Sequence, residues 1–193
     1  MPETVSFGYQ EVAPEEKTRR VGAVFSNVAR RYDVMNDAMS AGMHRLWKNR
    51  FVRRLKPRAA ETILDMAGGT GDIAFRIAAA GAQVTVADIN PQMLEVGMDR
   101  AQTRRIEGLT WTEQNAERLT LADRSYDAYT IAFGIRNVTD VPAALREAHR
   151  VLKRGGALLL PGVLDDRLAR LRGGVRRLFA PCRAAHRQGR RGG

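Results

Sequence analysis

Two acidic residues and a glycine-rich turn form the stretch with the clearest chemistry. Asp65 closes a short apolar run, and Gly68, Gly69 and Gly71 follow it. Glycine suits a turn between a strand and a helix, because a side chain there would keep the backbone away from a ligand. Asp88 ends the next apolar run, where a carboxylate can accept hydrogen bonds from both hydroxyls of a ribose. The spacing therefore predicts a site for a nucleoside-like cofactor.

The identity of the nucleoside is narrowed by the residues around this turn. Gly69-x-Gly71-x-x-Ala74 with a later acid also fits a dinucleotide site, as in an NAD-dependent dehydrogenase. However, Asp65 would repel a pyrophosphate, whereas it suits the cationic sulfonium and ammonium groups of S-adenosylmethionine (SAM). After the third apolar run, residues 114–117 (QNAE) offer an amide and backbone groups for an adenine edge. These features favour SAM, and the dehydrogenase remains the alternative.

Alternating apolar runs and helical segments must position these residues. The predicted strands are 62–67, 83–89, 109–114, 126–133 and 156–160, and the predicted helices are 72–80, 91–104 and 140–153. Pro91 and Pro142 suit a first helical turn. This alternation predicts an α/β fold with a doubly wound, mostly parallel, Rossmann-like sheet of five strands and right-handed crossovers. Ligands of such sheets lie outside the carboxyl ends of the strands, where Asp65 and Asp88 fall.

The chain divides into three parts by pattern. Residues 15–55 have helical apolar spacing, with a polar break at 36–42 and a second helical stretch through Trp47 and Phe51. We predict an N-terminal helical region over 1–57, which covers the site, and a SAM-binding domain over 58–160. Residues 161–193 form a basic, atypical tail without a strand pattern, which we expect to be disordered or out of frame and not to bury a core.

The composition predicts a soluble globular protein in a reducing, cytoplasmic setting. Hydrophobic residues make up 44% and charged residues 27%, and Cys182 is the only cysteine. The formal charge is +11, but nine arginines and two aspartates after residue 160 supply +7 of it and leave +4 for residues 1–160. The main body is therefore only mildly basic, and we expect no nucleic-acid partner. The pattern predicts no metal site either.

The order of these motifs resembles class I SAM-dependent methyltransferases. Two further stretches, YDVMNDAMSAGMHRLW (32–47) and FGIRNVTD (133–140), resemble the UbiE/COQ5 family of quinone-biosynthesis C-methyltransferases, and the resemblance covers about residues 7–160. It implies that SAM donates a methyl group to a ring carbon of a polyprenyl-benzoquinol or a demethylmenaquinol, in ubiquinone or menaquinone biosynthesis. Because that substrate is a lipid, the resemblance also implies peripheral contact with the inner membrane face or with a quinone-biosynthesis complex.

The resemblance also implies roles for individual residues near the cofactor. Thr70, Asp88, Asn115 and Ala116 match positions that contact SAM in the family, and they join Asp65, Gly69 and Gly71 from the turn. Family members often have serine where this chain has Ala132, which removes a side-chain hydrogen bond at that position.

The residues expected to serve the substrate come from the two family stretches. Arg136 is the candidate that stabilises a phenolate or orients a water base, with Asn137 in support; a surface ion pair is the alternative role for Arg136. Tyr32, Asp33 and Asn36 are expected to cover the site, and His44 is a candidate for handling protons. Since residues 1–160 contain no cysteine, a thiolate adduct is not expected.

The family resemblance stops at Pro161. The family continues its fifth strand into a glutamate followed by a serine, where this chain has Gly162 and Leu164, and it then adds closing strands that this chain lacks. We therefore hypothesise that residues 161–193 come from a shifted reading frame or a damaged gene, which resequencing would test. A second alternative follows: a truncated, non-catalytic methyltransferase remnant.

Overall fold

The computed structural model describes residues 5–7, 10–13, 16, 20 and 43–160, and most of its strands are joined by helices. In chain order they are β1 (Val5–Phe7), β2 (Gln10–Val12), α3 (Met43–Leu55), β3 (Thr62–Met66), α4 (Asp72–Ala78), β4 (Gln83–Asp88), α5 (Pro91–Thr103), β5 (Leu109–Glu113), β6 (Tyr126–Ile131), the 3-10 helix η2 (Phe133–Asn137), α6 (Val141–Val151) and β7 (Leu152–Leu159). The short strands β1 and β2 pair antiparallel, which the sequence did not predict.

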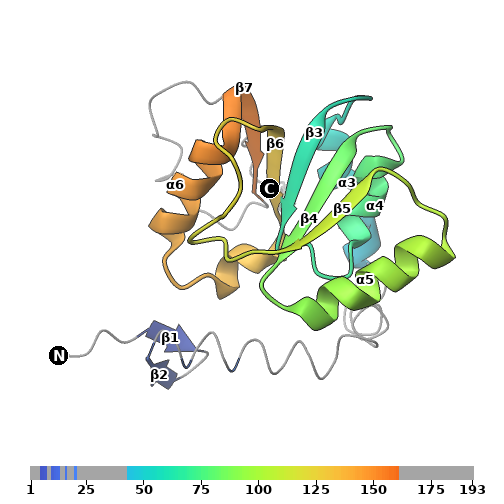
Figure 1. Ribbon diagram of the computed structural model, residues 1–193. Coiled ribbons are helices and arrows are strands. Elements are labelled where there is room, and N and C mark those ends of the chain that lie inside the picture. The colour runs from blue at the N-terminus through green and yellow to red at the C-terminus, as the bar shows by residue number, and fades with distance from the viewer. Residues whose placement is uncertain (1–4, 8–9, 14–15, 17–19, 21–42, 161–193) are drawn as a thin grey trace, which may run out of the picture.

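Five parallel strands form the central sheet in the order β5-β4-β3-β6-β7 (Figure 1). This confirms the predicted doubly wound, Rossmann-like sheet. The chain runs outward from β3 through β4 to β5, and then returns to place β6 on the other side of β3. The strand order thus reverses between β3 and β6. In open α/β sheets the ligand crevice lies at such a switch point, outside the carboxyl ends of the strands.

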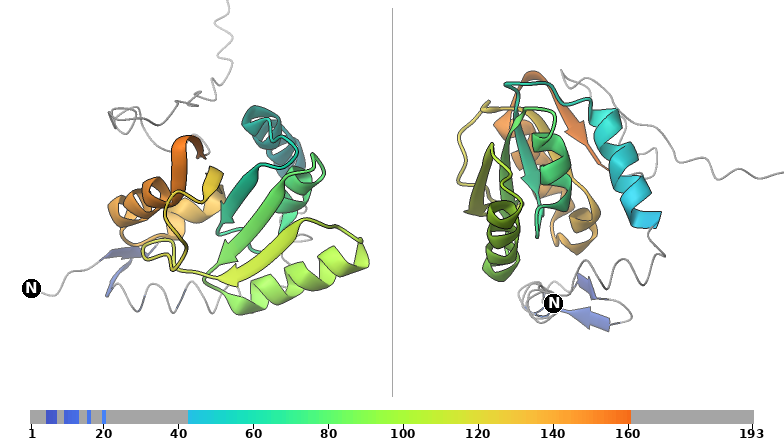
Figure 2. Two further views of the ribbon diagram at one scale, coloured as in Figure 1. Left: turned by 45° about the horizontal axis from the view of Figure 1, so that its top comes forward. Right: turned by 90° about the vertical axis from the view of Figure 1, so that its right-hand side faces the viewer.

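Apolar side chains alternate between the two faces of β3 and so build two cores. Ile63 packs with Phe51 of α3 and Ile77 of α4 on one face. Leu64 packs with Ala148 of α6 on the other face. Figure 2 (right) shows α3 and α4 together on one side of the sheet. Burial on both faces is what a parallel sheet requires, and it holds the strand ends, including Asp65, in fixed positions.

Two helices begin as the sequence predicts. The Asn90 side chain caps α5 by accepting hydrogen bonds from the backbone N–H groups of Gln92 (3.0 Å) and Met93 (3.2 Å), and Pro91 lies in the first turn. The Asp140 side chain caps α6 by accepting one from Ala143 N at 2.9 Å. Because Asn90 satisfies the start of α5, the neighbouring Asp88 is not needed as its cap.

Several boundaries differ from prediction, among them three between β6 and β7. The strand predicted to end at 133 ends at Ile131, and residues 133–137 turn into η2. The last strand begins at Leu152, not at 156, because Leu152 pairs with Tyr126 and the pairing resumes at Ala157, so that residues 153–156 bulge outward. The helix predicted to continue to 153 therefore ends at Val151.

The N-terminal helical prediction is described only in part. Helix α3 confirms the second helical stretch, whereas most of residues 15–42 lie outside the described part of the chain.

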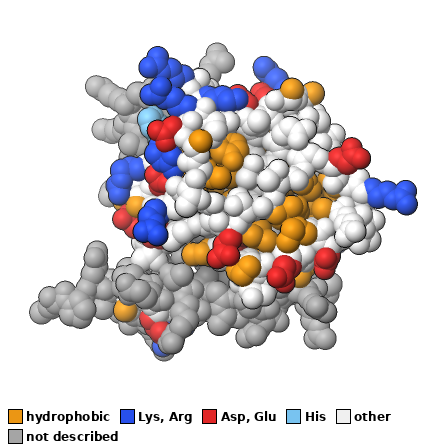
Figure 3. Space-filling model, in the orientation of Figure 1, with side chains coloured by type: hydrophobic (Ala, Val, Ile, Leu, Met, Phe, Trp, Pro, Cys, Tyr) orange, Lys and Arg blue, Asp and Glu red, His pale blue; other side chains and the backbone are white. Residues whose placement is uncertain are grey.

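None of the described helices combines the length and apolarity needed to cross a membrane. On the face seen in Figure 3, Lys and Arg side chains lie among Asp and Glu side chains on the left, over α6.

Candidate functional site

The glycine turn joins β3 to α4 and has a backbone conformation that other residues rarely adopt. Gly69 and Gly71 have φ angles of +53° and +79°. A Cβ atom on Gly71 would lie 2.6 Å from the Trp111 ring and 2.9 Å from that of Phe75. The turn is closed by a 2.9 Å hydrogen bond from Gly71 N to Gly68 O. Gly68, Gly69 and Gly71 therefore present backbone, not side chains, at the end of β3.

Asp88 lies beside this turn at the end of β4. Its Oδ2 accepts a hydrogen bond from Gly69 N at 2.9 Å, and its Oδ1 accepts one from Asn90 N at 2.9 Å. Burial raises the pKa of Asp88, and the hydrogen bonds from Asn90 and Gly69 oppose that rise. Each carboxylate oxygen has a second lone-pair site, so both can still accept a hydroxyl. The geometry suits the two hydroxyls of a ribose.

Asp65 is a buried carboxylate with one oxygen in use. Its side chain is 1% exposed, and its Oδ1 accepts a hydrogen bond from the Thr130 hydroxyl at 2.6 Å. Its Oδ2 has no hydrogen-bond partner among the described residues and lies near Gly68, where an added Cβ would be 3.1 Å away. Burial raises the pKa of Asp65 to about 7, the charge of Asp88 adds to the rise, and the Thr130 hydrogen bond opposes it. An orphaned buried acceptor at a glycine turn fits a cationic ligand group.

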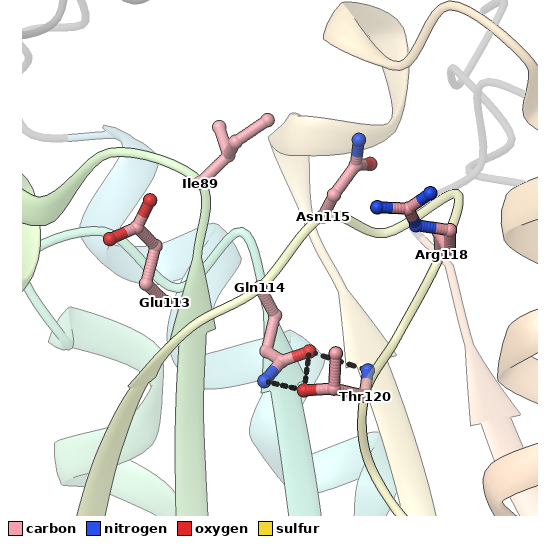
Figure 4. Close-up of a pocket in the computed structure, with 6 residues that line it drawn as sticks. All are labelled: Ile89, Glu113, Gln114, Asn115, Arg118 and Thr120. Carbon is pink, nitrogen blue, oxygen red and sulfur yellow. Dashed lines mark hydrogen bonds between the residues drawn. The ribbon is translucent and has the colours of Figure 1, made fainter.

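The loop after β5 lines a hollow of about 440 Å³ near Asp88. The side chain of Gln114 is turned inward and hydrogen-bonds Thr120 and Thr112, with Thr120 N donating to Gln114 Oε1 at 2.9 Å. Figure 4 shows that Asn115 and Ile89 instead point away from this network, toward the same side. The side-chain oxygen Oδ1 of Asn115 accepts a hydrogen bond from Glu117 N at 2.9 Å, which leaves the side-chain NH₂ group of Asn115 as a donor for a ligand.

The remaining cofactor candidates supply packing surface. Thr70 is buried, and its backbone carbonyl accepts a hydrogen bond from Arg100 Nη1 at 3.2 Å. Ala116 and Ala132 are buried, Ala116 in the loop after β5 and Ala132 directly after β6. Their methyl groups can contact a ligand only by van der Waals packing.

The two catalytic candidates lie on η2. Arg136 is exposed, and its guanidinium carbon lies 5.9 Å from the centre of the Phe133 ring. Phe133 in turn packs against Trp47 of α3, with ring centres 4.5 Å apart. No described carboxylate forms an ion pair with Arg136, so the alternative role as an ion-pair partner has no support within residues 43–160. Asn137 follows it at the end of η2, half-buried.

The substrate-site candidates of the N-terminal region fall largely outside the described residues. Tyr32, Asp33 and Asn36 lie outside the described residues. His44 lies in the first turn of α3, and its side chain is outside the description.

A buried ion pair between α3 and α4 supports the glycine turn, and no local pattern in the sequence predicts it. Lys48 is 6% exposed, and its Nζ lies 2.6 Å from Oδ2 of Asp72, the first residue of α4. Burial alone would raise the pKa of Asp72, but the hydrogen bonds from Lys48 and Arg76 outweigh it and lower the pKa to about 2. Lys48 and Asp72 are 24 residues apart, so no periodic pattern links them. Thr130, which holds Asp65, was missed for the same reason.

The amino-acid sequence matches a known family and curated relatives. Residues 12–164 match the ubiE/COQ5 methyltransferase family model. The UbiE ubiquinone/menaquinone biosynthesis C-methyltransferase of Zymomonas mobilis is 66% identical over 154 residues, which are 80% of this chain and 64% of that protein. The mitochondrial 2-methoxy-6-polyprenyl-1,4-benzoquinol methylase of Arabidopsis thaliana is 53% identical over an alignment of 175 positions, which covers 80% of this chain and 61% of that protein. The chain thus spans less than two thirds of the length of these curated relatives.

Solved structures match the fold at lower identity. A SAM-dependent methyltransferase from Methanococcus maripaludis, described as putative, has a TM-score of 0.62 at 18% identity and covers 70% of this chain and 62% of its own. The YcgJ protein of Bacillus subtilis has a TM-score of 0.56 at 30% identity and covers 58% of this chain and 48% of its own. The fold is that of class I SAM-dependent methyltransferases, and the family match over residues 12–164 shows that this chain belongs to the ubiE/COQ5 methyltransferase family.

Proposed function

We propose that the chain binds SAM and methylates a ring carbon of a polyprenyl-benzoquinol or a demethylmenaquinol, a step of ubiquinone or menaquinone biosynthesis. The observation that carries the proposal is the pairing of two carboxylates, Asp65 and Asp88, with the glycine turn at the switch point of the sheet. The relatives at 66% and 53% identity are a ubiquinone/menaquinone biosynthesis C-methyltransferase and a polyprenyl-benzoquinol methylase, which supports the substrate class.

The donor set of the site fits SAM in charge and in hydrogen bonding. Bound SAM supplies a methyl group on a sulfonium centre. Asp65, with its free buried oxygen, would attract the positive charge of the methionine end. Asp88 would accept hydrogen bonds from the ribose, and Asn115 would donate to the adenine edge. Gly69, Thr70, Gly71 and Ala116 would contact the ligand through backbone and methyl surfaces.

The substrate chemistry asks for positioning and for charge stabilisation. A hydroquinol is electron-rich, and loss of its hydroxyl proton makes the adjacent ring carbon a better nucleophile. Holding that carbon in line with a methyl donor is mostly a positioning effect. Arg136, exposed on η2, would stabilise the phenolate or orient a water that takes the proton, and Asn137 would support it. Tyr32, Asp33 and Asn36 remain proposals for covering the site, and His44 remains a proposal for handling protons.

A ligand comparison tests the cofactor against the dehydrogenase alternative. SAM at about 100 times its dissociation constant should stabilise the fold by roughly 2.7 kcal/mol, and NAD should leave the melting temperature unchanged. Transfer of a labelled methyl group from SAM to a demethylmenaquinol analogue should then be measurable. Stabilisation by NAD alone would overturn the cofactor proposal. A cooperative melt without transfer would favour the non-catalytic remnant.

Arg136 gives a direct test of the proposed chemistry. Arg136→Ala should lower kcat by roughly tenfold to hundredfold, because a developing phenolate loses a charged donor at an exposed position. The dissociation constant of SAM should change by less than about threefold, since Arg136 lies on η2 and not at the glycine turn. Arg146→Ala, an exposed arginine on α6, is the matched control. An unchanged kcat in Arg136→Ala would remove Arg136 from the mechanism.

The setting of the reaction follows from the proposed substrate. A polyprenyl tail is insoluble in water, so we propose a cytoplasmic protein that contacts the inner membrane face, or a quinone-biosynthesis complex, peripherally. Vesicle sedimentation with and without quinol would measure that contact.

A further inference from the structure

Glu117 joins two loops that carry different parts of the site. Its backbone N–H donates to Asn115 Oδ1 at 2.9 Å, so the residue belongs to the loop after β5 that lines the hollow. Its side-chain Oε1 accepts hydrogen bonds from Thr139 N at 2.7 Å and Asp140 N at 3.0 Å. Thr139 and Asp140 lie 22 and 23 residues further along the chain, directly before α6. One carboxylate thus links the loop after β5 to the segment that follows η2.

The two amide groups need this acceptor. Asp140 is the N-cap of α6, and the positive end of a helix dipole favours an anion in front of it. The Asp140 side chain faces into its own helix and accepts from Ala143 N at 2.9 Å. Glu117 therefore binds amides that Asp140 does not serve. Hydrogen bonds between a carboxylate and backbone N–H groups are among the stronger ones in proteins.

The other end of η2 is fixed by packing. A Cβ atom on Gly134 would lie 2.2 Å from Ala67 Cβ, so η2 abuts the residue that opens the glycine turn. Phe133 packs against Trp47 at the same end, with the two ring planes tilted by 37°. Arg136 and Asn137 lie between this contact and the amides held by Glu117. Fixing both ends of a five-residue 3-10 helix restricts where Arg136 can reach.

We propose that Glu117 is a positioning residue for methyl transfer, which ties the loop that would hold the adenine to the segment that carries Arg136 and Asn137. This inference rests on the proposed function, because the reaction gives Arg136 its task. Glu117 touches neither reacting group. It acts through the backbone of Thr139 and Asp140, and its removal should affect the rate more than cofactor binding.

Amide hydrogen exchange and steady-state kinetics on the full chain test this inference together. In Glu117→Ala the amides of Thr139 and Asp140 should exchange at least about tenfold faster in the ligand-free protein. The kcat for methyl transfer should fall roughly tenfold to hundredfold, because small displacements of a positioned group have effects of that size. The KM for SAM should rise by less than about threefold. Glu117→Gln keeps an oxygen that can accept both amides and should restore kcat to within about threefold of the wild type.

Glu107→Ala is the matched control, since Glu107 is exposed before β5 and has no hydrogen bond or ion pair to a described residue. It should change neither exchange nor kcat. If Glu117→Ala does not fold, Glu117→Asp, which is one methylene shorter, should show the same changes. The inference is overturned if amide exchange at Thr139 and Asp140 is unchanged in Glu117→Ala. It is also overturned if Glu117→Gln shows the same fall in kcat and the same rise in KM for SAM as Glu117→Ala. If the wild type binds no SAM, the proposed function fails, and the exchange comparison in the ligand-free protein still decides whether Glu117 ties the two loops.

Discussion

Replacing Asp88 with asparagine is expected to raise the dissociation constant of SAM by a factor of about 100 or more. The carboxylate accepts from Gly69 N and Asn90 N, each at 2.9 Å, and the proposed ribose adds two hydroxyl donors. An asparagine amide has one acceptor oxygen, so its NH₂ group must face either a backbone N–H or a hydroxyl. Losing the charged acceptors of two hydroxyls should cost about 3 kcal/mol or more of binding free energy. Since about 1.4 kcal/mol changes a dissociation constant tenfold, this loss corresponds to a factor of about 100.

Calorimetric titration with SAM would measure this loss directly. Asp99→Asn is the matched control, because Asp99 is exposed on α5, next along the chain from β4. It should bind SAM as the wild type does. The asparagine at position 88 should still leave a folded protein, since burial already disfavours the charged form of Asp88. Equal SAM affinity in Asp88→Asn and Asp99→Asn would show that the ribose does not bind at this carboxylate.

The parts of the site that the sequence predicts are those formed by local signals and by sheet geometry. Asp65, the glycine turn and Asp88 each end a strand or follow one directly. The carboxyl ends of neighbouring parallel strands meet at one edge, so predicting β3 and β4 is enough to bring them together. The cap at Asn90 was predictable because its signal, a short polar side chain before proline, lies within three residues.

The parts that the sequence does not predict depend on contacts between distant segments. Phe133 continues the apolar pattern of the preceding strand, but residues 133–137 form η2 because Gly134 fits against Ala67. The link between Glu117 and the start of α6 spans 22 residues, and nothing in its local pattern differs from a solvated loop. Propensity and periodicity report on neighbours in sequence, so such contacts appear only once the sheet order is known.

Asp65 is expected to give the ligand-free protein a stability that falls as pH rises. Its pKa in the folded protein is about 7, against 3.8 for an ordinary aspartate. Between these values the folded state holds a proton that the unfolded state has released, so stability is greatest at the acidic end of this window and is lost as pH approaches 7. The full difference is on the order of 4 kcal/mol at 1.36 kcal/mol per pH unit. Asp65→Asn should remove this dependence and be the more stable protein at pH 8, as urea melts at pH 5.5, 6.5 and 8 would show.

Binding of SAM should have the opposite dependence on pH, and this contrast separates a cofactor role from a structural one. A cationic ligand needs the ionised carboxylate, so affinity should rise as pH increases through about 7 and level off above it. Below that value the dissociation constant should increase about tenfold for each pH unit, because binding then requires release of one proton. In Asp65→Asn the affinity should be roughly 100-fold weaker at pH 8 and should no longer depend on pH between 6 and 8. Burial of an ionised carboxylate without a full set of partners destabilises the ligand-free protein, and binding of the cationic ligand offsets this destabilisation. If Asp65→Asn gains stability at pH 8 yet binds SAM as tightly as the wild type, Asp65 does not serve the cofactor. It would then be a destabilising residue of the core only.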